Sequence, residues 1–93
     1  MKVYLAGKIS GDPGYWSKFS LAQEQLEDEG HIVLNPAELP DGLTPEDYMA
    51  ICFSMIHCAD AAAFLPDWAE SRGASLEHGY CRYIGKPVWY LRK

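Results

Sequence analysis

Four short apolar runs alternate along the chain with three longer segments of mixed polarity. Glycine, proline or asparagine bounds each run, a pattern typical of strands that are buried on both faces of a sheet. The runs are residues 2–6, 31–34, 60–65 and 87–91. The third has the weakest β propensity because it contains three alanines. The pattern predicts four strands of a parallel sheet.

The three intervening segments carry helix signals. In residues 13–29, apolar side chains fall on one side of a helix and acidic side chains largely on the other. The apolar side holds Trp16, Phe19, Ala22 and Leu26, and the polar side holds Glu24, Glu27 and Asp28. Thr44, followed by a proline and two carboxylates, predicts the start of a second helix that runs to about Cys58. Ser71 can cap a third helix, which reaches Ile84 before a glycine ends it.

Strands that alternate with helices predict an α/β fold with helices on both faces of the sheet. We expect a three-layer sandwich of the flavodoxin or Rossmann-like type with a four-stranded parallel sheet. Right-handed crossovers favour the strand order 2-1-3-4. In that order the winding reverses between strands 1 and 3, so the loops at 7–14 and 66–73 flank one crevice. Ligands of open α/β sheets bind in such a crevice.

Length and charge limit the classes of function. A chain of 93 residues has room for one core, so residues 1–93 are predicted to form a single domain. Its 48% hydrophobic and 23% charged residues are typical of a folded globular protein. The net charge is −5 and the eight Lys and Arg residues are scattered, which argues against a nucleic-acid polymer as partner. The small core and the aromatic residues Trp68, Trp89 and Tyr90 lead us to expect a homo-oligomer.

No stretch approaches the roughly 20 apolar residues that span a bilayer, so no membrane partner is predicted. Strand-like sequence directly after Met1 predicts a cytoplasmic protein. Cys52, Cys58 and Cys81 form no spacing typical of a disulfide framework or a metal site. The three histidines have no recognisable catalytic or metal partner and are interpreted as structural. We expect neither a metal nor a cofactor.

The loop after the first predicted strand is a candidate phosphate or sugar site. It contains Gly7, Lys8, Ile9, Ser10 and Gly11. Its glycines let backbone N–H groups approach an anion, and the lysine and serine add a cation and a hydroxyl. It matches neither of the two common glycine-rich phosphate motifs, so an ordinary strand-to-helix turn is the alternative.

The second predicted wall of the crevice combines an aromatic ring, a hydroxyl and carboxylates. Ser71 and the amide of Gly73 can hold a phosphate at a helix N-terminus, or Ser71 is only the helix cap. Trp68 can stack on a base or belong to an interface. Glu77 either interacts favourably with the helix dipole or reaches a ligand where the helix rises from the crevice.

Several short segments together resemble the nucleoside 2-deoxyribosyltransferase-like superfamily. They are Tyr4-Leu5-Ala6-Gly7, Asn35-Pro36-Ala37, Ala59-Asp60-Ala61, Leu65-Pro66-Asp67-Trp68 and Ser71-x-Gly73-Ala74-x-x-Glu77. The resemblance extends over nearly the whole chain. It is nearest to a small, often phage-borne branch without a characterised function, whose members share the Leu-Pro-x-Trp-x-x-Ser-x-Gly-Ala-x-x-Glu segment.

This resemblance implies cleavage of the N-glycosidic bond of deoxynucleosides or of their 5′-monophosphates. A glutamate matching Glu77 attacks C1′ of the sugar and forms a glycosyl ester. Tyr4 resembles the tyrosine that contacts this nucleophile. The resemblance also implies that Ser71 and residues 7–11 bind phosphate, and that Asn35 lies in the substrate site.

One position departs from the family pattern. The relatives carry an aspartate on the helix before the third strand, where this chain has Cys52 or Phe53. Protonation of the leaving base would then fall to Asp67, Asp47 or water. The leading hypothesis is an N-glycosidase or deoxyribosyltransferase with Glu77 as nucleophile and Asp67 as acid. The alternative is a non-catalytic nucleotide-binding or sensor module.

Overall fold

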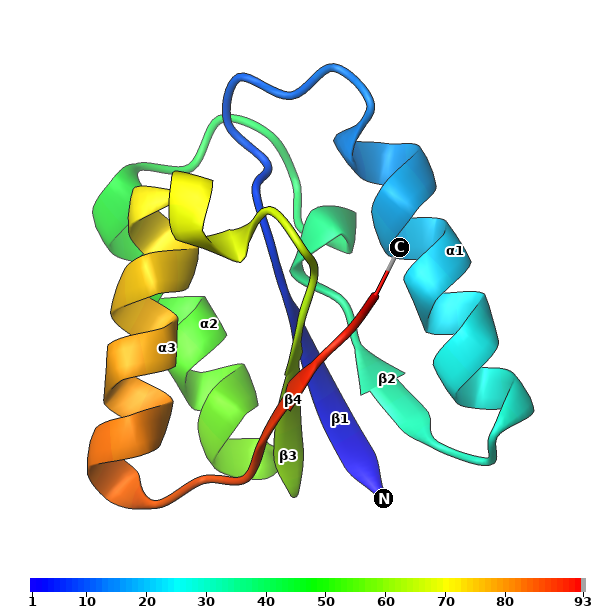
Figure 1. Ribbon diagram of the computed structural model, residues 1–93. Helices are drawn as coiled ribbons and strands as arrows, with labels where there is room; N and C mark the ends of the chain where they lie inside the picture. Colours follow the sequence, from blue (N-terminus) through cyan, green and yellow to red (C-terminus); the bar gives the residue numbers. More distant parts are fainter. Residues whose placement is uncertain (93) are drawn as a thin grey trace.

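The computed structural model describes residues 1–92 and has a four-stranded parallel sheet at its centre (Figure 1). The strand order β2-β1-β3-β4 confirms the predicted order and the α/β class. The strands are β1 (Lys2–Ala6), β2 (Ile32–Leu34), β3 (Ala61–Phe64) and β4 (Val88–Tyr90). Each differs from its predicted range by no more than one residue at either end.

Three helices connect the strands and form the two outer layers (Figure 1). They are α1 (Tyr15–Asp28), α2 (Pro45–Cys58) and α3 (Arg72–Ile84). Two short 3-10 helices, η1 (Pro36–Glu38) and η2 (Trp68–Glu70), follow β2 and β3. Both predicted caps are present: Thr44 forms a capping box with Asp47 at the start of α2, and Ser71 caps α3.

The core has two parts, one on each face of the sheet. Val3 and Leu5 of β1 pack with Phe19 of α1, whereas Tyr4 packs with residues of α2 and α3, among them Ile56. This alternation follows from the two-residue period of a strand. All four residues of β3 are buried. The burial of its alanines between the helical layers explains why a strand of low propensity forms here.

Trp16 corrects one prediction. Its side chain is 54% exposed, although the sequence pattern places it on the buried side of the first helix. Tyr15 packs against the core in its place, because it lies four residues before Phe19 on the buried stripe of α1. No helix within residues 1–92 is long and apolar enough to cross a bilayer.

The carboxyl ends of β1 and β3 approach so closely at Gly7 that no side chain fits. A Cβ atom built on Gly7 would lie 2.7 Å from Leu65 Cδ1 and 2.9 Å from Leu65 Cβ. The backbone N–H of Leu65 donates to the Ala6 carbonyl at 2.8 Å, which holds the two strand ends together. Glycine is therefore required where the chain leaves β1 for the candidate site.

Gly7→Ala should destabilise the protein by about 1–3 kcal/mol, because the added methyl overpacks against Leu65. Gly79→Ala is the control, since a Cβ at this exposed position of α3 meets no atom within 4 Å. It should stabilise the protein by up to about 1 kcal/mol through helix propensity. Urea unfolding measures both variants. A Gly7→Ala protein as stable as the unmodified one would contradict the tight approach.

Candidate functional site

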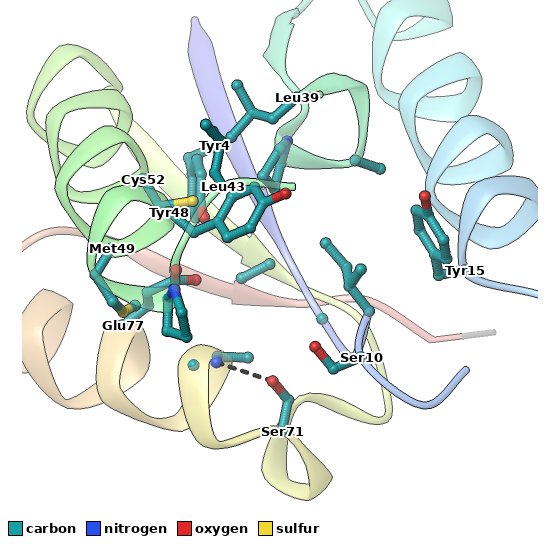
Figure 2. A pocket seen from close by; sticks show the side chains of 18 of the residues that line it. Tyr4, Ser10, Tyr15, Leu39, Leu43, Tyr48, Met49, Cys52, Ser71 and Glu77 are labelled. Carbon is teal, nitrogen blue, oxygen red and sulfur yellow. Dashed lines mark hydrogen bonds between the residues drawn. The ribbon is translucent and has the colours of Figure 1, made fainter. Parts of the chain in front are cut away.

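A cavity of about 590 Å³ opens at the carboxyl edge of the sheet. Its walls come from the loop after β1, the segment between β2 and α2, the inner face of α2 and the first two turns of α3 (Figure 2). This is the edge where the reversal of winding predicts a crevice. Much of the lining comes from α2 and from the segment that follows β2. Neither was predicted from the sequence to contribute this much.

Glu77 of α3 is the buried charged residue of the cavity. Glu77 is only 6% exposed, and its carboxyl group lies near the Tyr4 hydroxyl and the Cys52 thiol, which both influence its ionisation. Tyr4 comes from β1 and Cys52 from α2, and both are buried. Figure 2 shows the three residues around the cavity, each on a different element. The structure therefore brings the predicted nucleophile and the predicted tyrosine together.

Burial controls the ionisation of this trio. It raises the pKa of Glu77 to about 7, although the neighbouring Tyr4 hydroxyl and Cys52 thiol act in the opposite direction. Burial also raises the pKa of Cys52 to about 11 and that of Tyr4 well above its ordinary value. Near neutral pH the carboxyl group thus exchanges its proton while its two neighbours remain donors. A perturbed carboxyl group in a cavity is a candidate functional group.

Hydroxyl and glycine residues form a polar side of the cavity. Ser10 lies in the loop after β1, and Ser71 lies just before α3, on the same side of the cavity (Figure 2). Ser71 Oγ accepts a hydrogen bond from the Ala74 N–H at 3.1 Å, which shows the capping role. Gly73 exposes backbone to the cavity in the first turn of α3. The predicted residues Gly7 and Ile9 also line it.

Asp67, predicted as a catalytic acid, does not line the cavity. Its carboxylate accepts hydrogen bonds from the Lys18 ammonium and from the Lys8 N–H, the latter at 3.1 Å. The same ammonium also donates to Asp12. Burial opposes the charge of Lys18, but its bonds to the two carboxylates raise its pKa overall. Asp67 is thus part of an ion-pair cluster outside the cavity.

Four predicted binding residues also lie outside the lining. Trp68 stacks on His78 with 4.0 Å between ring centroids, so one face of its indole ring is occupied. The Asn35 side chain accepts from the Ala37 N–H and donates to Gln23, at 2.8 Å each, and thereby caps η1. The ammonium of Lys8 is paired with a carboxylate of η2, and Gly11 forms a turn with a φ of 80°.

The cavity also has an apolar and aromatic wall that was not predicted from the sequence. Tyr48, Met49 and Cys52 lie on one face of α2, at the three- and four-residue spacing that marks a helical stripe. That spacing is the signal that could have placed Tyr48 in the site. The Tyr48 hydroxyl donates to the Pro40 carbonyl at 2.6 Å and holds the segment before α2 in place. Asp41 of this segment lines the cavity as well.

Among residues 1–92, no group of three or more His, Cys, Asp or Glu side chains lies close enough together to hold a metal ion. Of the described residues that line the cavity, Glu77 and Asp41 carry ionisable carboxyl groups. The arrangement offers a buried carboxyl group with two proton donors, a polar side and an aromatic wall. It suits a ligand that has both a polar and a flat apolar part.

The chain belongs to the family described as "Domain of unknown function (DUF4406)", whose model matches residues 1–90. No curated protein matches the sequence. Among solved structures, a 2-deoxyribosyltransferase from the psychrotolerant bacterium Bacillus psychrosaccharolyticus has a TM-score of 0.77 at 23% identity. That match covers 97% of this chain and 71% of the other.

Two further structures are similar. A 2-desoxiribosyltransferase from Leishmania mexicana has a TM-score of 0.76 at 17% identity, covering 97% of this chain and 63% of its own. A conserved protein from Enterococcus faecalis V583 has a TM-score of 0.71 at 22% identity. That match covers 100% of this chain and 64% of the other. These likenesses show that the chain shares the fold of 2-deoxyribosyltransferases. The chain spans less than two thirds of the length of these last two proteins.

The buried carboxyl group of Glu77 should make stability depend on pH. The group ionises near its ordinary pKa of 4.5 in the unfolded chain and near 7 in the folded one. Its contribution is therefore fully present below about pH 4.5 and is lost as the pH rises through 7. Because a tenfold change in an ionisation constant corresponds to about 1.4 kcal/mol, the loss amounts to roughly 3 kcal/mol.

Glu77→Gln removes this titration, so its stability relative to the unmodified protein should rise between pH 5 and pH 8. Urea unfolding at several pH values measures the difference. Glu24→Gln, at an exposed position of α1, is the matched control and should show no such trend. A stability difference between Glu77→Gln and the unmodified protein that stays constant with pH would refute the assignment.

Proposed function

We propose that this protein cleaves the N-glycosidic bond of deoxynucleosides or of their 5′-monophosphates, with Glu77 as the nucleophile. The observation that carries the proposal is the buried Glu77 carboxyl group on the cavity, beside Tyr4 and Cys52, where burial raises its pKa to about 7. The fold shared with 2-deoxyribosyltransferases supports it. The phage-borne branch and the cytoplasmic location remain predictions.

The reaction is a double displacement with retention of configuration. An ionised oxygen of Glu77 attacks C1′, the C1′–N bond breaks, and the base leaves with the bonding electron pair and takes up a proton. Water or a second base then attacks C1′ and releases the carboxylate, which gives hydrolysis or transfer. Tyr4 and Cys52 lie beside the carboxyl group and favour its ionised form.

The two sides of the cavity suit the two parts of a nucleoside. The wall with Tyr48, Met49 and the leucines of the segment before α2 is apolar and aromatic, which favours a flat base. Ser10, Ser71 and the Gly73 backbone favour sugar hydroxyls or a phosphate, since a helix N-terminus attracts anions. Glu77 lies in the second turn of the same helix, where C1′ must come.

The source of the proton for the leaving base is assigned anew. Asp67 is engaged by Lys18, and Asp47 bonds back to the Thr44 N–H at 3.2 Å in the capping box of α2. Asp41 is the second carboxyl group along the cavity lining, so we assign the proton delivery to Asp41, with water as the alternative. General-acid help of this kind contributes about 10²–10⁴-fold to a rate.

A non-catalytic nucleotide-binding or sensor module is the second candidate. The observation that favours it is the thiol of Cys52 beside Glu77, because the resemblance implies an aspartate at Cys52 or Phe53 and this chain has no carboxyl group at either position. A sensor would bind the same ligands in the same cavity and release no base.

We also propose that the protein self-associates. Trp68 and Trp89, which the sequence offered as interface residues, pack partly buried against the core, whereas Tyr90 is 54% exposed. Leu76, Tyr83 and Ile84 of α3 are exposed to 61%, 90% and 40%, which supports an interface on that helix.

Glu77→Gln should lower the rate of base release by at least about a thousandfold, while ligands still bind. The amide keeps the shape of the side chain but loses the nucleophilic charge. In the unmodified protein, base release should rise with pH through about 7 as Glu77 ionises. A panel of deoxynucleosides and monophosphates, assayed by chromatography, measures both effects, with Glu24→Gln as control. Turnover that survives in Glu77→Gln would exclude the nucleophile. Tight binding without turnover by either protein would favour the sensor.

Monophosphates should bind more tightly than the matching nucleosides if Ser10, Ser71 and Gly73 hold a 5′-phosphate. Ser71→Ala should reduce the difference in affinity between monophosphates and nucleosides. Calorimetric titration measures both affinities. The substitution also removes the cap of α3, which costs about 1 kcal/mol of stability. Thr44→Ala removes the corresponding cap of α2 and should leave the ratio of affinities unchanged. Equal affinities for both ligand types in the unmodified protein would argue against a phosphate site.

A further inference from the structure

Lys18 of α1 joins two loops that are far apart in the sequence. Its ammonium donates to Asp12, in the loop after β1, and to Asp67, in the loop after β3. The side chains of all three residues are 25–27% exposed. Lys18 does not line the cavity, yet both loops that it joins lead directly into the cavity walls.

Each carboxylate also binds backbone of the loop after β1. Asp67 accepts from the Lys8 N–H at 3.1 Å, and Asp12 accepts from the Gly14 N–H at 2.9 Å. The loop is therefore held at both ends by carboxylates that share one ammonium. Ser10 lies between these two anchor points, and Ser71 follows four residues after Asp67.

We propose that Lys18 is a positioning residue that sets the separation between the Ser10 and Ser71 sides of the cavity. The proposal rests on the proposed function, in which these serines receive the sugar or phosphate end of the substrate. Lys18 touches no substrate and acts through Asp12 and Asp67. The assignment also accounts for Asp67, whose carboxylate the sequence analysis expects in the reaction itself.

Charge explains why the lysine is needed for this geometry. Without the ammonium, two carboxylates that now share one partner would face each other in a partly buried site. Like charges repel more strongly where solvent screens them poorly. Removing Lys18 therefore takes away the link between the loops and adds a force that separates them. Arginine retains the charge and can bind both carboxylates, so it should preserve the link.

The test compares Lys18→Met, which keeps an unbranched apolar chain, with Lys18→Arg. Lys86→Met is the matched control, because Lys86 is a partly buried lysine that bonds to the Ala59 carbonyl, before the amino end of β3. For Lys18→Met we expect KM for base release to rise about tenfold or more, since small misplacements of binding groups are costly. The kcat should change by less than about threefold, because Glu77 lies on α3 outside both loops.

Hydrogen exchange in the ligand-free protein supplies a second readout. The Lys8 and Gly14 amides should exchange faster in Lys18→Met and at the original rate in Lys18→Arg and in the control. The Arg variant should also restore KM. An unchanged KM in Lys18→Met would overturn the positioning role, and so would an equal rise of KM in Lys86→Met. In either case, base release by the unmodified protein would still support the proposed function.

Absence of base release from the unmodified protein would instead refute the proposed reaction. The positioning role is then decided by the affinity of deoxynucleoside 5′-monophosphates, measured by calorimetric titration. A loss of about tenfold or more in Lys18→Met, with recovery in Lys18→Arg, supports the role for a binding site. Equal affinities, or no binding by any of the proteins, overturn it.

Discussion

The parallel pairing of β1 with β3 is the constraint on which the site depends. These neighbouring strands carry α1 on one side of the sheet and α2 and α3 on the other, so the chain leaves their carboxyl ends in diverging directions. Only a residue without a side chain fits at Gly7, where the first strand ends against Leu65. The cavity occupies the space that the diverging chain leaves open.

The burial of Glu77 connects this architecture with chemistry. The carboxyl group lies within the packed layer between the sheet and two helices, where the Tyr4 hydroxyl and the Cys52 thiol are its neighbours. Burial costs stability when the group is ionised, and the same burial raises its pKa to about 7. Sites that place a charge in a poorly solvated position commonly trade stability for function.

The ion pairs around Lys18 separate two kinds of acidic residue near the site. Asp67 and Glu77 both belong to the segment that resembles the deoxyribosyltransferase-like superfamily, ten residues apart. The Asp67 carboxylate binds the ammonium of Lys18 and connects two loops. The Glu77 carboxyl group lies beside a neutral hydroxyl and a neutral thiol and faces the cavity. Two residues of the same chemical class therefore have different surroundings, and burial on the cavity raises the pKa of Glu77 to about 7.

Local sequence patterns determined the elements of this protein and the part of the site that directly follows them. Periodicity and turn residues, which are properties of short segments, predicted the strand ranges and both helix caps. Together with the winding direction, they also placed Glu77, Ser71 and Gly7 at the carboxyl edge of the sheet. The exposure of Trp16 was decided by packing, because the neighbouring Tyr15 reaches the core.

Only the tertiary structure decided which side chains meet. The stacking of Trp68 on His78 and the pairing of Asp67 with Lys18 each join residues from different elements, as does the trio around Glu77. The spacing of Tyr48 and Cys52 shows that they share a helix face, but not what that face meets. The sequence specifies where each strand and helix begins and ends, whereas contacts across the cavity depend on how the layers pack.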